Sequence, residues 1–425
     1  MAAVATVVHG TVRAPGDKSI SHRALILSAL ARGKSRISNI LESADVQSTA
    51  KVLRALGADV PPLSSEFLVT GQPPRFLRDP PVPLDCGNSG TTARLMAGVV
   101  AGVGINAKLV GDASLSRRPM RRVAEPLTAM GGTIALAAHG GLPLEIFAKP
   151  LHPIEWNSPI ASAQVKSAVL LAALFGGVQA RVREPHLSRD HTERMLAARG
   201  VALHLSDDGR TVDIEAGQVL RPVDVSVPAD PSSAAFFVAL ALLASDGELR
   251  LSDVCLNPTR TGFYRVLERM NADVSMIDVR DEGGERVGTL VARPSRLRGI
   301  TISAHEVPAM IDELPLLACL AARADGVSEV RGAGELRVKE SDRIATIVAN
   351  LRELGVAAEE LEDGFVVEGT NRPLRGTATT NGDHRIAMCF GVLGALSGNS
   401  VLIDDPACVD ISYPGFWQEL QRVVG

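Results

Sequence analysis

The 425-residue chain has few aromatic residues, which make up 3% of its length, and it has no excess of positive charge. Its 44 lysine and arginine residues are outnumbered by 48 aspartate and glutamate residues, which gives a formal net charge of −4. Proteins that bind mainly nucleic acid need surplus cations for the phosphates and aromatic rings for stacking on bases. The composition therefore argues against nucleic acid as a partner.

Long hydrophobic runs and paired cysteines are absent as well. No uninterrupted apolar stretch reaches the roughly 18 residues of a membrane-spanning helix, and residues 1–9 lack the basic region of a secretory signal. The five cysteines lie far apart without any Cys-x-x-Cys pair, which is typical of buried reduced thiols and not of disulfides or a metal site. We therefore expect a cytoplasmic protein with no membrane span and no bound metal.

What the chain does have is an internal repeat. Six segments share a polar or glycine-rich start followed by a helix rich in alanine, leucine and valine, and successive starts lie 71, 74, 69, 82 and 70 residues apart. The starts are Gly16, Gly87, Ala161, Asp230, Asp312 and Gly382. Each of these segments is followed by an amphipathic helix, and short β-like runs lie between the helices. The pattern predicts an α/β protein built by repetition.

The length and the repeat together predict two domains of three units each. A chain of this size exceeds one hydrophobic core, and the proline-containing segment 228–231 separates the first three repeats from the last three. We assign 16–228 to an N-terminal domain, and 1–15 with 229–425 to a C-terminal domain. Because the first helix of each repeat is apolar on nearly every side, we expect it at its domain's centre, with its polar start facing a cleft between the domains.

The first helix start is rich in groups that bind anions. Lys18, Ser19 and Arg23 follow a Pro-Gly turn, and the last two share a face because they are four residues apart. Free N–H groups and the positive end of the helix dipole add to the two cations, so we expect a phosphate or carboxylate site. A solvated, charged helix start is the alternative. A nucleotide P-loop is excluded because Asp17 separates Gly16 from the lysine.

The other helix starts offer further polar groups, for which an ordinary cap or a solvated face is the alternative reading. The 87–94 segment is a glycine-rich turn, 162–167 offers a hydroxyl, an amide and an ammonium, and 339–343 is a dense charge cluster. Asp312 is either a general base or an N-cap. The cations near these starts are Lys18, Arg23, Arg94, Arg118, Arg189, Lys339, Arg343 and Arg385. They would repel one another unless they face anionic ligands or paired carboxylates, so we expect two anionic substrates, at least one of them a phosphate.

Five ordered stretches resemble one enzyme family, the EPSP synthases. They are PGDKSISHRALILSALA, LDCGNSGTTARL, SAQVKSAVLLAAL, LRVKESDRI and NGDHRIAM. The resemblance implies a two-domain inside-out α/β barrel of six βαβαββ repeats, three per domain. It also implies that phosphoenolpyruvate donates its enolpyruvyl group to the 5-hydroxyl of shikimate 3-phosphate by addition and elimination, without a metal or organic cofactor, in the pathway to chorismate and the aromatic amino acids. We further expect a monomer, with glyphosate as a candidate inhibitor.

The resemblance also implies roles for individual residues. The shikimate 3-phosphate set is Lys18, Ser19, Arg23, Ser162, Ala163, Gln164, Arg189, Asp312 and Lys339. The phosphoenolpyruvate set is Lys18, Gly90, Arg118, Gln164, Arg343 and Arg385. Asp312 is the expected base for the 5-hydroxyl, and Glu340 with Lys18 is the expected proton donor and acceptor at C3 of phosphoenolpyruvate. Because cations favour an ionised carboxylate, Glu340 needs burial or a nearby carboxylate to hold a proton.

Two alternatives remain open from the sequence. A UDP-N-acetylglucosamine enolpyruvyl transferase would share the fold, but it carries a Gly-Ala-Lys-Asn type of motif and a loop cysteine, whereas this chain has Gly-Asp-Lys-Ser and no cysteine in 117–119. A non-catalytic anion-binding scaffold would not need carboxylates beside its ligands, so Asp312 and Glu340 argue against it. Two positions depart from the common family pattern, since Leu95 and Ile411 stand where many relatives have proline and lysine.

Overall fold

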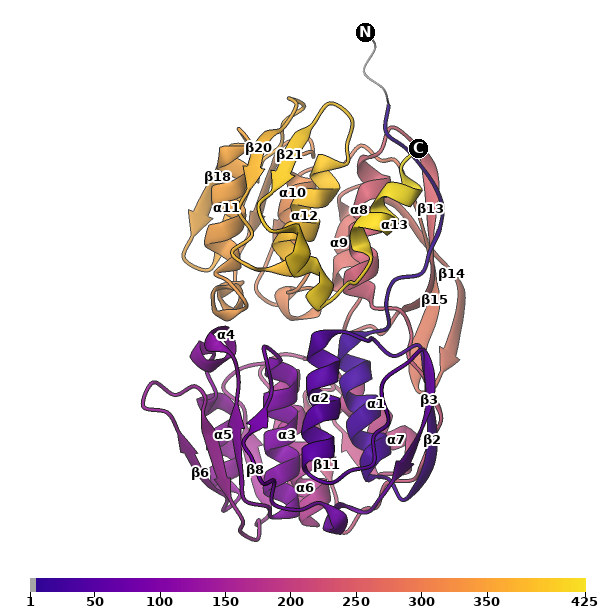
Figure 1. Cartoon of the computed structure of the whole chain (residues 1–425). Helices are drawn as coiled ribbons and strands as arrows, with labels where there is room; N and C mark the ends of the chain where they lie inside the picture. The colour runs from indigo at the N-terminus through magenta and orange to yellow at the C-terminus, as the bar shows by residue number, and fades with distance from the viewer. Residues whose placement is uncertain (1–4) are drawn as a thin grey trace. The chain divides into compact units, whose positions relative to one another are not determined.

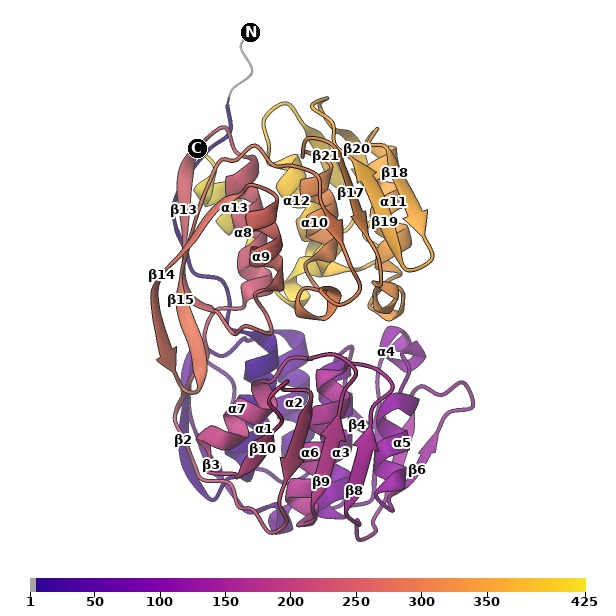
Figure 2. The same ribbon diagram turned by 180° about the vertical axis from the view of Figure 1, so that it is seen from behind.

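The computed structural model describes residues 5–425, which form two compact units. The N-terminal unit contains Gly16–Val227 and the short stretch Glu282–Glu285. The C-terminal unit contains the segment that ends at Pro15, together with Pro228–Asp281 and Arg286–Gly425. In Figures 1 and 2 the N-terminal unit is drawn mostly in indigo to magenta, and the C-terminal unit mostly in red-orange to yellow.

The N-terminal unit is built from small mixed sheets with helices packed against them. Its strand orders are β12-β2-β3, β4-β5-β7-β6 and β10-β11-β9-β8, and in each sheet one pair is parallel. The strands are β2 Gly33–Ser38, β3 Glu66–Gly71, β4 Leu84–Asp85, β5 Ala107–Val110, β6 Thr133–Leu136, β7 Leu144–Phe147, β8 Ile154–Asn157, β9 Ala180–Arg183, β10 Leu203–Leu205, β11 Thr211–Ile214 and β12 Val225–Ser226. The helices are α1 Lys18–Leu30, α2 Ala44–Ala55, α3 Gly90–Val103, α4 Ala113–Arg117, α5 Arg121–Ala129, α6 Ala163–Gly176, α7 His191–Ala198 and the 3-10 turn η1 Pro74–Phe76.

Three helices, α1, α3 and α6, form the centre of this unit. Their side chains are mostly alanine, leucine and valine, and nearly all of them are buried. Helices α3 and α6 approach unusually closely, because a Cβ atom added at Gly98 would lie 2.2 Å from the carbonyl oxygen of Ala168. Glycine is required at that crossing, and both helices end on a glycine in the left-handed conformation, Gly104 and Gly177.

The C-terminal unit repeats this plan. Its strand orders are β1-β13-β15-β14, β16-β17-β19-β18 and β20-β21. The strands are β1 Val7–Val12, β13 Asp246–Cys255, β14 Asp273–Glu282, β15 Glu285–Arg293, β16 Thr301–Ile302, β17 Val327–Val330, β18 Ala358–Leu361, β19 Gly364–Glu368, β20 Arg375–Ala378 and β21 Ser400–Ile403. The helices are α8 Pro231–Leu243, α9 Gly262–Arg269, α10 Leu314–Ala321, α11 Arg343–Glu353, α12 His384–Gly394, α13 Phe416–Val423 and the 3-10 turns η2 Val307–Ala309, η3 Gly334–Val338 and η4 Pro406–Ile411.

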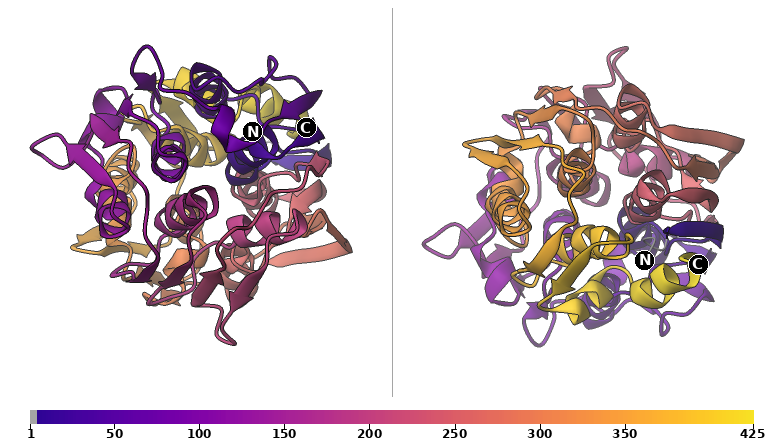
Figure 3. Two further views of the ribbon diagram at one scale, coloured as in Figure 1. Left: turned by 90° about the horizontal axis from the view of Figure 1, so that it is seen from below. Right: turned by 90° about the horizontal axis from the view of Figure 1, so that it is seen from above.

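The core of the C-terminal unit lies around α8, α10 and α12, which contact one another. An aromatic cluster adds to it, with the rings of Phe236 and Phe237 of α8 lying 5.9 and 5.6 Å from that of Phe416 in α13. Strand β1 pairs in parallel with β13, so the N-terminal strand lies in a sheet of this unit. Figure 3 shows the helices of each unit nearly end-on.

The predicted α/β repeat is confirmed. All six apolar helices and all six amphipathic helices occur where the sequence places them. Before the first of these helices, residues 5–15 contain one strand, β1. Four repeats have the complete βαβαββ order, whereas the sheets β12-β2-β3 and β20-β21 have fewer strands within residues 5–425. No helix in that same range is long and apolar enough to cross a membrane.

Candidate active site

The start of α1 brings a lysine, a serine and two carboxylates together. Lys18 Nζ lies 3.1 Å from Asp45 Oδ2 of α2, and Ser19 beside it is partly exposed. Asp17 is fully buried, and its Oδ1 accepts a hydrogen bond from the backbone N–H of Ile20 at 2.8 Å. One N–H group of this helix start is therefore taken by a carboxylate, whose charge also offsets part of the positive end of the helix dipole.

Arg23 is held in a fixed orientation one turn further along α1. Its Nε donates to Thr192 Oγ1 at 2.6 Å, its Nη2 to Ser167 Oγ at 2.8 Å and its Nη1 to the carbonyl oxygen of Ser19 at 2.9 Å. Burial lowers the pKa of the guanidinium to about 10, and the nearby cation of Arg189 acts in the same direction against three carboxylates. An additional anion at this place would stabilise the charged form.

The start of α3 gathers residues expected around phosphoenolpyruvate. A Cβ atom at Gly90 would lie 2.9 Å from Nη1 of Arg94 and 3.5 Å from Nη1 of Arg118, so both guanidinium groups lie beside this glycine. Arg118 Nη2 donates to Asn88 Oδ1 at 2.5 Å, and Arg94 Nη1 donates to Gln164 Oε1 at 2.7 Å. The structure thus places Gly90, Arg118 and Gln164 in one group, with Arg94 linking them.

At the start of α6, the Ser162 hydroxyl accepts a hydrogen bond from Val165 N at 3.4 Å and caps the helix that begins at Ala163. The backbone N–H of Ser162 donates to Glu184 Oε1 at 2.8 Å. Arg189 is partly buried, five residues beyond that carboxylate in the loop before α7. Ser162 therefore acts as a cap in this structure, and its orientation is fixed by a glutamate that follows β9.

In the C-terminal unit, Asp312 lies among three cations just before α10. Its Oδ1 lies 3.5 Å from Lys339 Nζ and 3.5 Å from Arg343 Nη1, and its backbone carbonyl accepts from Arg385 Nη1 at 3.4 Å. Nearby cations stabilise the ionised form of a carboxylate. Four of the predicted residues thus lie together in this unit.

Arg343 is surrounded by carboxylates and its side chain is 1% exposed. Its Nε donates to Asp383 Oδ2 at 2.8 Å, and its Nη2 donates to Asp383 Oδ1 at 3.2 Å and to Glu340 Oε2 at 2.7 Å. Burial alone would raise the pKa of Asp383, but the Arg343 guanidinium outweighs it and holds that pKa below the ordinary value. Arg343 is therefore paired with carboxylates of the protein itself, mainly through Nε and Nη2, which its sequence position did not indicate.

Sequence reasoning missed the residues that hold the predicted ones in place. Asp45, Glu184 and Asp383 each contact an expected binding residue or its neighbour, yet none was singled out. Asp383 was the easiest to find, because an aspartate before the first residue of a helix is a common N-cap. Arg94 was counted among the cations without a role. Ile411 ends η4 and supplies no charge there.

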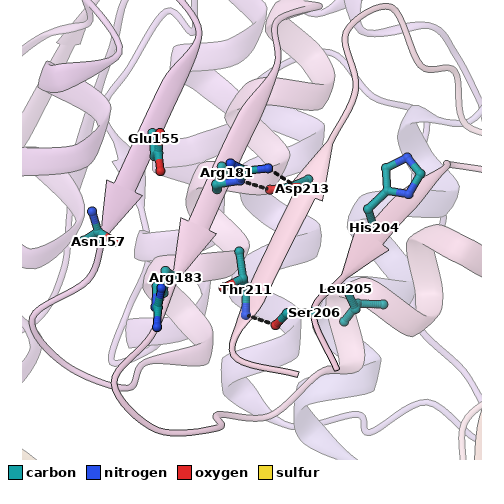
Figure 4. Close-up of a pocket in the computed structure, with 9 residues that line it drawn as sticks. All are labelled: Glu155, Asn157, Arg181, Arg183, His204, Leu205, Ser206, Thr211 and Asp213. Carbon is teal, nitrogen blue, oxygen red and sulfur yellow. Dashed lines mark hydrogen bonds and ion pairs between the residues drawn. The ribbon is translucent and has the colours of Figure 1, made fainter. Parts of the chain in front are cut away.

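One pocket of about 370 Å³ lies on the outer face of β8, β9, β10 and β11. Figure 4 shows its lining, in which Arg181 and Asp213 face each other across neighbouring strands with bonds of 2.7 and 2.8 Å. None of its lining residues belongs to the predicted substrate sets. Arg181, one of the two arginines in this lining, is thus paired with a carboxylate of the pocket itself.

Comparison with known proteins gives one consistent result. The family model described as EPSP synthase (3-phosphoshikimate 1-carboxyvinyltransferase) matches residues 4–420. The chain is 49% identical to 3-phosphoshikimate 1-carboxyvinyltransferase of Aquifex aeolicus over 98% of this chain and 97% of that protein. It is 46% identical to the enzyme of the same name from Sulfurihydrogenibium sp., again over 98% and 97% of the two chains.

Solved structures agree with these sequence matches. EPSP synthase from Acinetobacter baumannii is similar with a TM-score of 0.86 and 36% identity, over 99% of this chain and 97% of that one. The enolpyruvyl transferase NikO from Streptomyces tendae is similar with a TM-score of 0.74 at 19% identity, over 100% and 97%, which bears on the fold alone. The predicted two-domain inside-out α/β fold class is thereby confirmed.

Proposed function

Because the chain belongs to the EPSP synthase family, we propose that the cations and carboxylates described above bind and convert that family's two substrates. The chain transfers the enolpyruvyl group of phosphoenolpyruvate to the 5-hydroxyl of shikimate 3-phosphate and releases phosphate, in aromatic amino-acid biosynthesis. The observation that carries the site assignment is the clustering of cations and carboxylates at the starts of buried helices. The sugar-nucleotide transferase and the non-catalytic scaffold are not favoured by these matches.

Shikimate 3-phosphate is bound, in this proposal, mainly by residues of the N-terminal unit. Lys18, Ser19 and Arg23 supply two cations and a hydroxyl within two turns of α1. The remaining residues of the set are Ser162, Ala163, Gln164 and Arg189, with Asp312 and Lys339 from the other unit. Two features support the assignment. The guanidinium of Arg23 is buried and already oriented by Thr192, and burial makes its charged form costly unless an anion is present.

Phosphoenolpyruvate is bound, in this proposal, by Gly90, Arg118 and Gln164 of one unit and by Arg343 and Arg385 of the other, with Lys18 shared between the substrates. Support comes from the close approach of two guanidinium groups to Gly90. A side chain at this position would occupy space that an anion between those cations needs. The guanidinium group of arginine can form two parallel hydrogen bonds with a carboxylate or a phosphate, and phosphoenolpyruvate carries both of these groups.

Asp312 is the proposed base for the 5-hydroxyl. The two cations 3.5 Å from its Oδ1 keep the carboxylate ionised and able to accept a proton. The hydroxyl oxygen then attacks C2 of phosphoenolpyruvate while C3 receives a proton, which gives a tetrahedral intermediate. Loss of a proton from C3 then forms the C2–C3 double bond, breaks the bond from C2 to the phosphate oxygen and releases phosphate, which leaves the enol ether of the product.

Glu340 is the proposed carrier of the C3 proton, together with Lys18. Three carboxylates, those of Asp312, Glu340 and Asp383, surround the single guanidinium of Arg343. The two-pronged contact with Arg343 keeps Asp383 ionised, and its negative charge opposes a second anion at Glu340. Asp383 thus supplies a nearby carboxylate that favours a proton on Glu340, whereas the contact from Arg343 Nη2 at 2.7 Å favours the ionised form, and carrying a proton requires access to both states.

We also propose that the protein is a cytoplasmic monomer, with glyphosate as a candidate inhibitor. The buried free cysteines fit a reducing compartment. No element in residues 5–425 carries more than two exposed large apolar side chains, which gives no obvious surface for association. Glyphosate carries both a phosphonate and a carboxylate, so the guanidinium groups beside Gly90 would bind it in place of phosphoenolpyruvate.

Phosphate release with purified protein tests the assignment. Release is expected with phosphoenolpyruvate and shikimate 3-phosphate, and none with UDP-N-acetylglucosamine. Asp312→Ala should lower kcat by about two to four orders of magnitude, as for loss of a general base, while both substrates still bind. Near-normal turnover of that variant would remove Asp312 as the base, and light scattering on the same sample measures the oligomeric state.

A further inference from the structure

A buried group of three charges lies beneath the proposed phosphate site of the N-terminal unit. Lys166 Nζ of α6 lies 2.8 Å from Glu184 Oε2, just after β9, and 2.8 Å from Glu193 Oε1 of α7. All three side chains are at most 4% exposed. Burial lowers the pKa of Lys166, but the two carboxylates outweigh burial and raise it, so the ammonium stays charged. We call these residues the Lys166 triplet.

The two glutamates of the triplet have different surroundings. Glu184 Oε1 accepts a hydrogen bond from the backbone N–H of Ser162 at 2.8 Å, and its Oε2 accepts from Ser188 Oγ at 2.7 Å in addition to Lys166. Glu193 contacts the lysine through Oε1, while its Oε2 is buried without a hydrogen-bond partner. Glu184 thus joins three segments of the chain, and Glu193 supplies charge.

Glu184 is not needed merely to neutralise Lys166, because Glu193 already pairs with that ammonium. One carboxylate balances one ammonium, so the triplet carries a net negative charge in the interior of the unit proposed to bind a phosphate. That charge opposes anion binding. Glu184 makes contacts that Glu193 does not, and these indicate a different role. They hold Ser162, which caps α6, and Ser188, which lies directly before Arg189.

We propose that Glu184 is a positioning residue for shikimate 3-phosphate, which holds Ser162 and the Ser188–Arg189 segment in the arrangement that receives the phosphate group. The proposal rests on the assignment of Ser162 and Arg189 to that substrate. Glu184 does not contact the ligand itself. It acts through a backbone N–H on one side and a serine hydroxyl on the other, both anchored to a buried ammonium.

The test compares Glu184→Gln with Glu193→Gln, which remove the same charge from the same lysine. Calorimetric titration measures the Kd for shikimate 3-phosphate, and steady-state kinetics measure the KM for phosphoenolpyruvate at saturating shikimate 3-phosphate. E184Q should bind shikimate 3-phosphate about 10- to 100-fold more weakly, because a single amide oxygen cannot accept from Ser162, Ser188 and Lys166 as the two carboxylate oxygens do. E193Q should bind it within about 3-fold of the unchanged protein, because the loss of a charge that opposes the phosphate is offset by the loss of a carboxylate that favours the charged form of Arg23.

A merely structural role predicts a different result. The proposal would be overturned if E184Q and E193Q weakened the binding of shikimate 3-phosphate equally, or if E184Q left that affinity unchanged. It would also be overturned if E184Q raised the KM for phosphoenolpyruvate by the same factor as the Kd for shikimate 3-phosphate. If E184Q does not fold in a thermal melt, Glu184→Asp replaces it. That side chain keeps the charge beside Lys166 but is one methylene too short to reach both serines, so weakened binding is again expected and normal binding refutes the proposal.

Ser162→Ala separates this inference from the site assignment on which it rests. Weakened binding in S162A with normal binding in E184Q refutes the positioning role alone. Normal binding in S162A shows instead that Ser162 does not belong to the shikimate 3-phosphate site, and both proposals then fail at that residue.

Discussion

Replacing Asp383 by asparagine should strongly destabilise the C-terminal unit. Asp383 is fully buried and accepts hydrogen bonds from Arg343 Nε at 2.8 Å, from Ser341 Oγ at 3.0 Å and from the backbone N–H of Arg385 at 3.0 Å. Asparagine keeps the size of the side chain and caps helices as well as aspartate does. The substitution therefore removes one charge and leaves the buried guanidinium of Arg343 without its two-pronged partner.

The expected loss is about 1.5–3 kcal/mol, the contribution of hydrogen bonding to a charged group, because Glu340 and Asp312 still neutralise Arg343. With a urea dependence of about 1–3 kcal/mol per molar, this lowers the unfolding midpoint by at least about 0.5 M. Asp383→Ala should lose about 1 kcal/mol more, because alanine also abolishes the cap of α12. Trp417 reports on the C-terminal unit when Trp156, the other tryptophan, is replaced by phenylalanine.

Asp342→Asn is the matched control. Asp342 also caps a helix and also pairs with an arginine, at 2.7 Å from Arg337 Nη1, but these two side chains are 39% and 27% exposed. Exposed pairs contribute about 0–1 kcal/mol, so D342N should change the midpoint little. Equal effects of D342N and D383N, or a loss below about 1 kcal/mol in D383N, would refute the argument from burial.

The same contact has a pH signature with a definite sign. Arg343 holds the folded pKa of Asp383 below the ordinary value of 3.8, although burial alone would raise it. The contribution of the pair to stability is therefore fully present above about pH 4 to 5 and is lost as the pH falls through the lower, folded value. The difference in free energy of unfolding between the unchanged protein and D383N, measured by urea titration, should be constant from pH 8 to pH 5 and should shrink below pH 4.

Glycine positions give two further tests. Gly98→Ala should destabilise the N-terminal unit by more than about 2 kcal/mol in thermal or urea unfolding, because its Cβ would lie 2.2 Å from the carbonyl oxygen of Ala168. The control Gly176→Ala meets atoms no closer than 3.5 Å and should be neutral or stabilising by up to about 1 kcal/mol. Gly90→Ala should raise the KM for phosphoenolpyruvate and weaken competitive inhibition by glyphosate, since its methyl group would lie 2.9 Å from a guanidinium nitrogen; unchanged constants would place both ligands elsewhere.

The helices of this fold could be predicted because their signals are local. An apolar run such as 231–243 has no polar side to expose, so it is a buried helix wherever the rest of the chain folds. Glycine at positions such as 104 and 177 marks the helix ends for an equally local reason. The incomplete repeats could not be predicted, because strand pairing depends on segments far apart, as when β12 joins β2.

The charge pairing could not be predicted for the same reason. The cations near the helix starts would repel one another, and this repulsion could be relieved either by bound anions or by carboxylates of the protein. Nothing in the sequence distinguishes these two possibilities. The structure gives carboxylate partners to several of them, since Lys18 pairs with Asp45 and Arg343 pairs with Asp383. These partners are 27 and 40 residues apart in the chain, which no local pattern connects. In the proposed site, an anionic ligand would therefore compete with these internal ion pairs for the same cations.

At the helix starts, some backbone N–H groups are likewise already bonded to side chains of the protein. Side chains already cap five of the six central helices, namely Asp17, Ser89, Ser162, Asp230 and Asp383. Each cap takes an N–H group that an anion would otherwise receive, and three of the caps are carboxylates that offset the helix dipole. Only α10 lacks a side-chain cap among these six, and Pro315 within its first turn has no N–H to offer. The proposed base Asp312 stands in front of that uncapped helix. In the proposed site, these caps leave fewer backbone N–H groups for an anion, so lysine and arginine side chains supply most of the positive charge that it would meet.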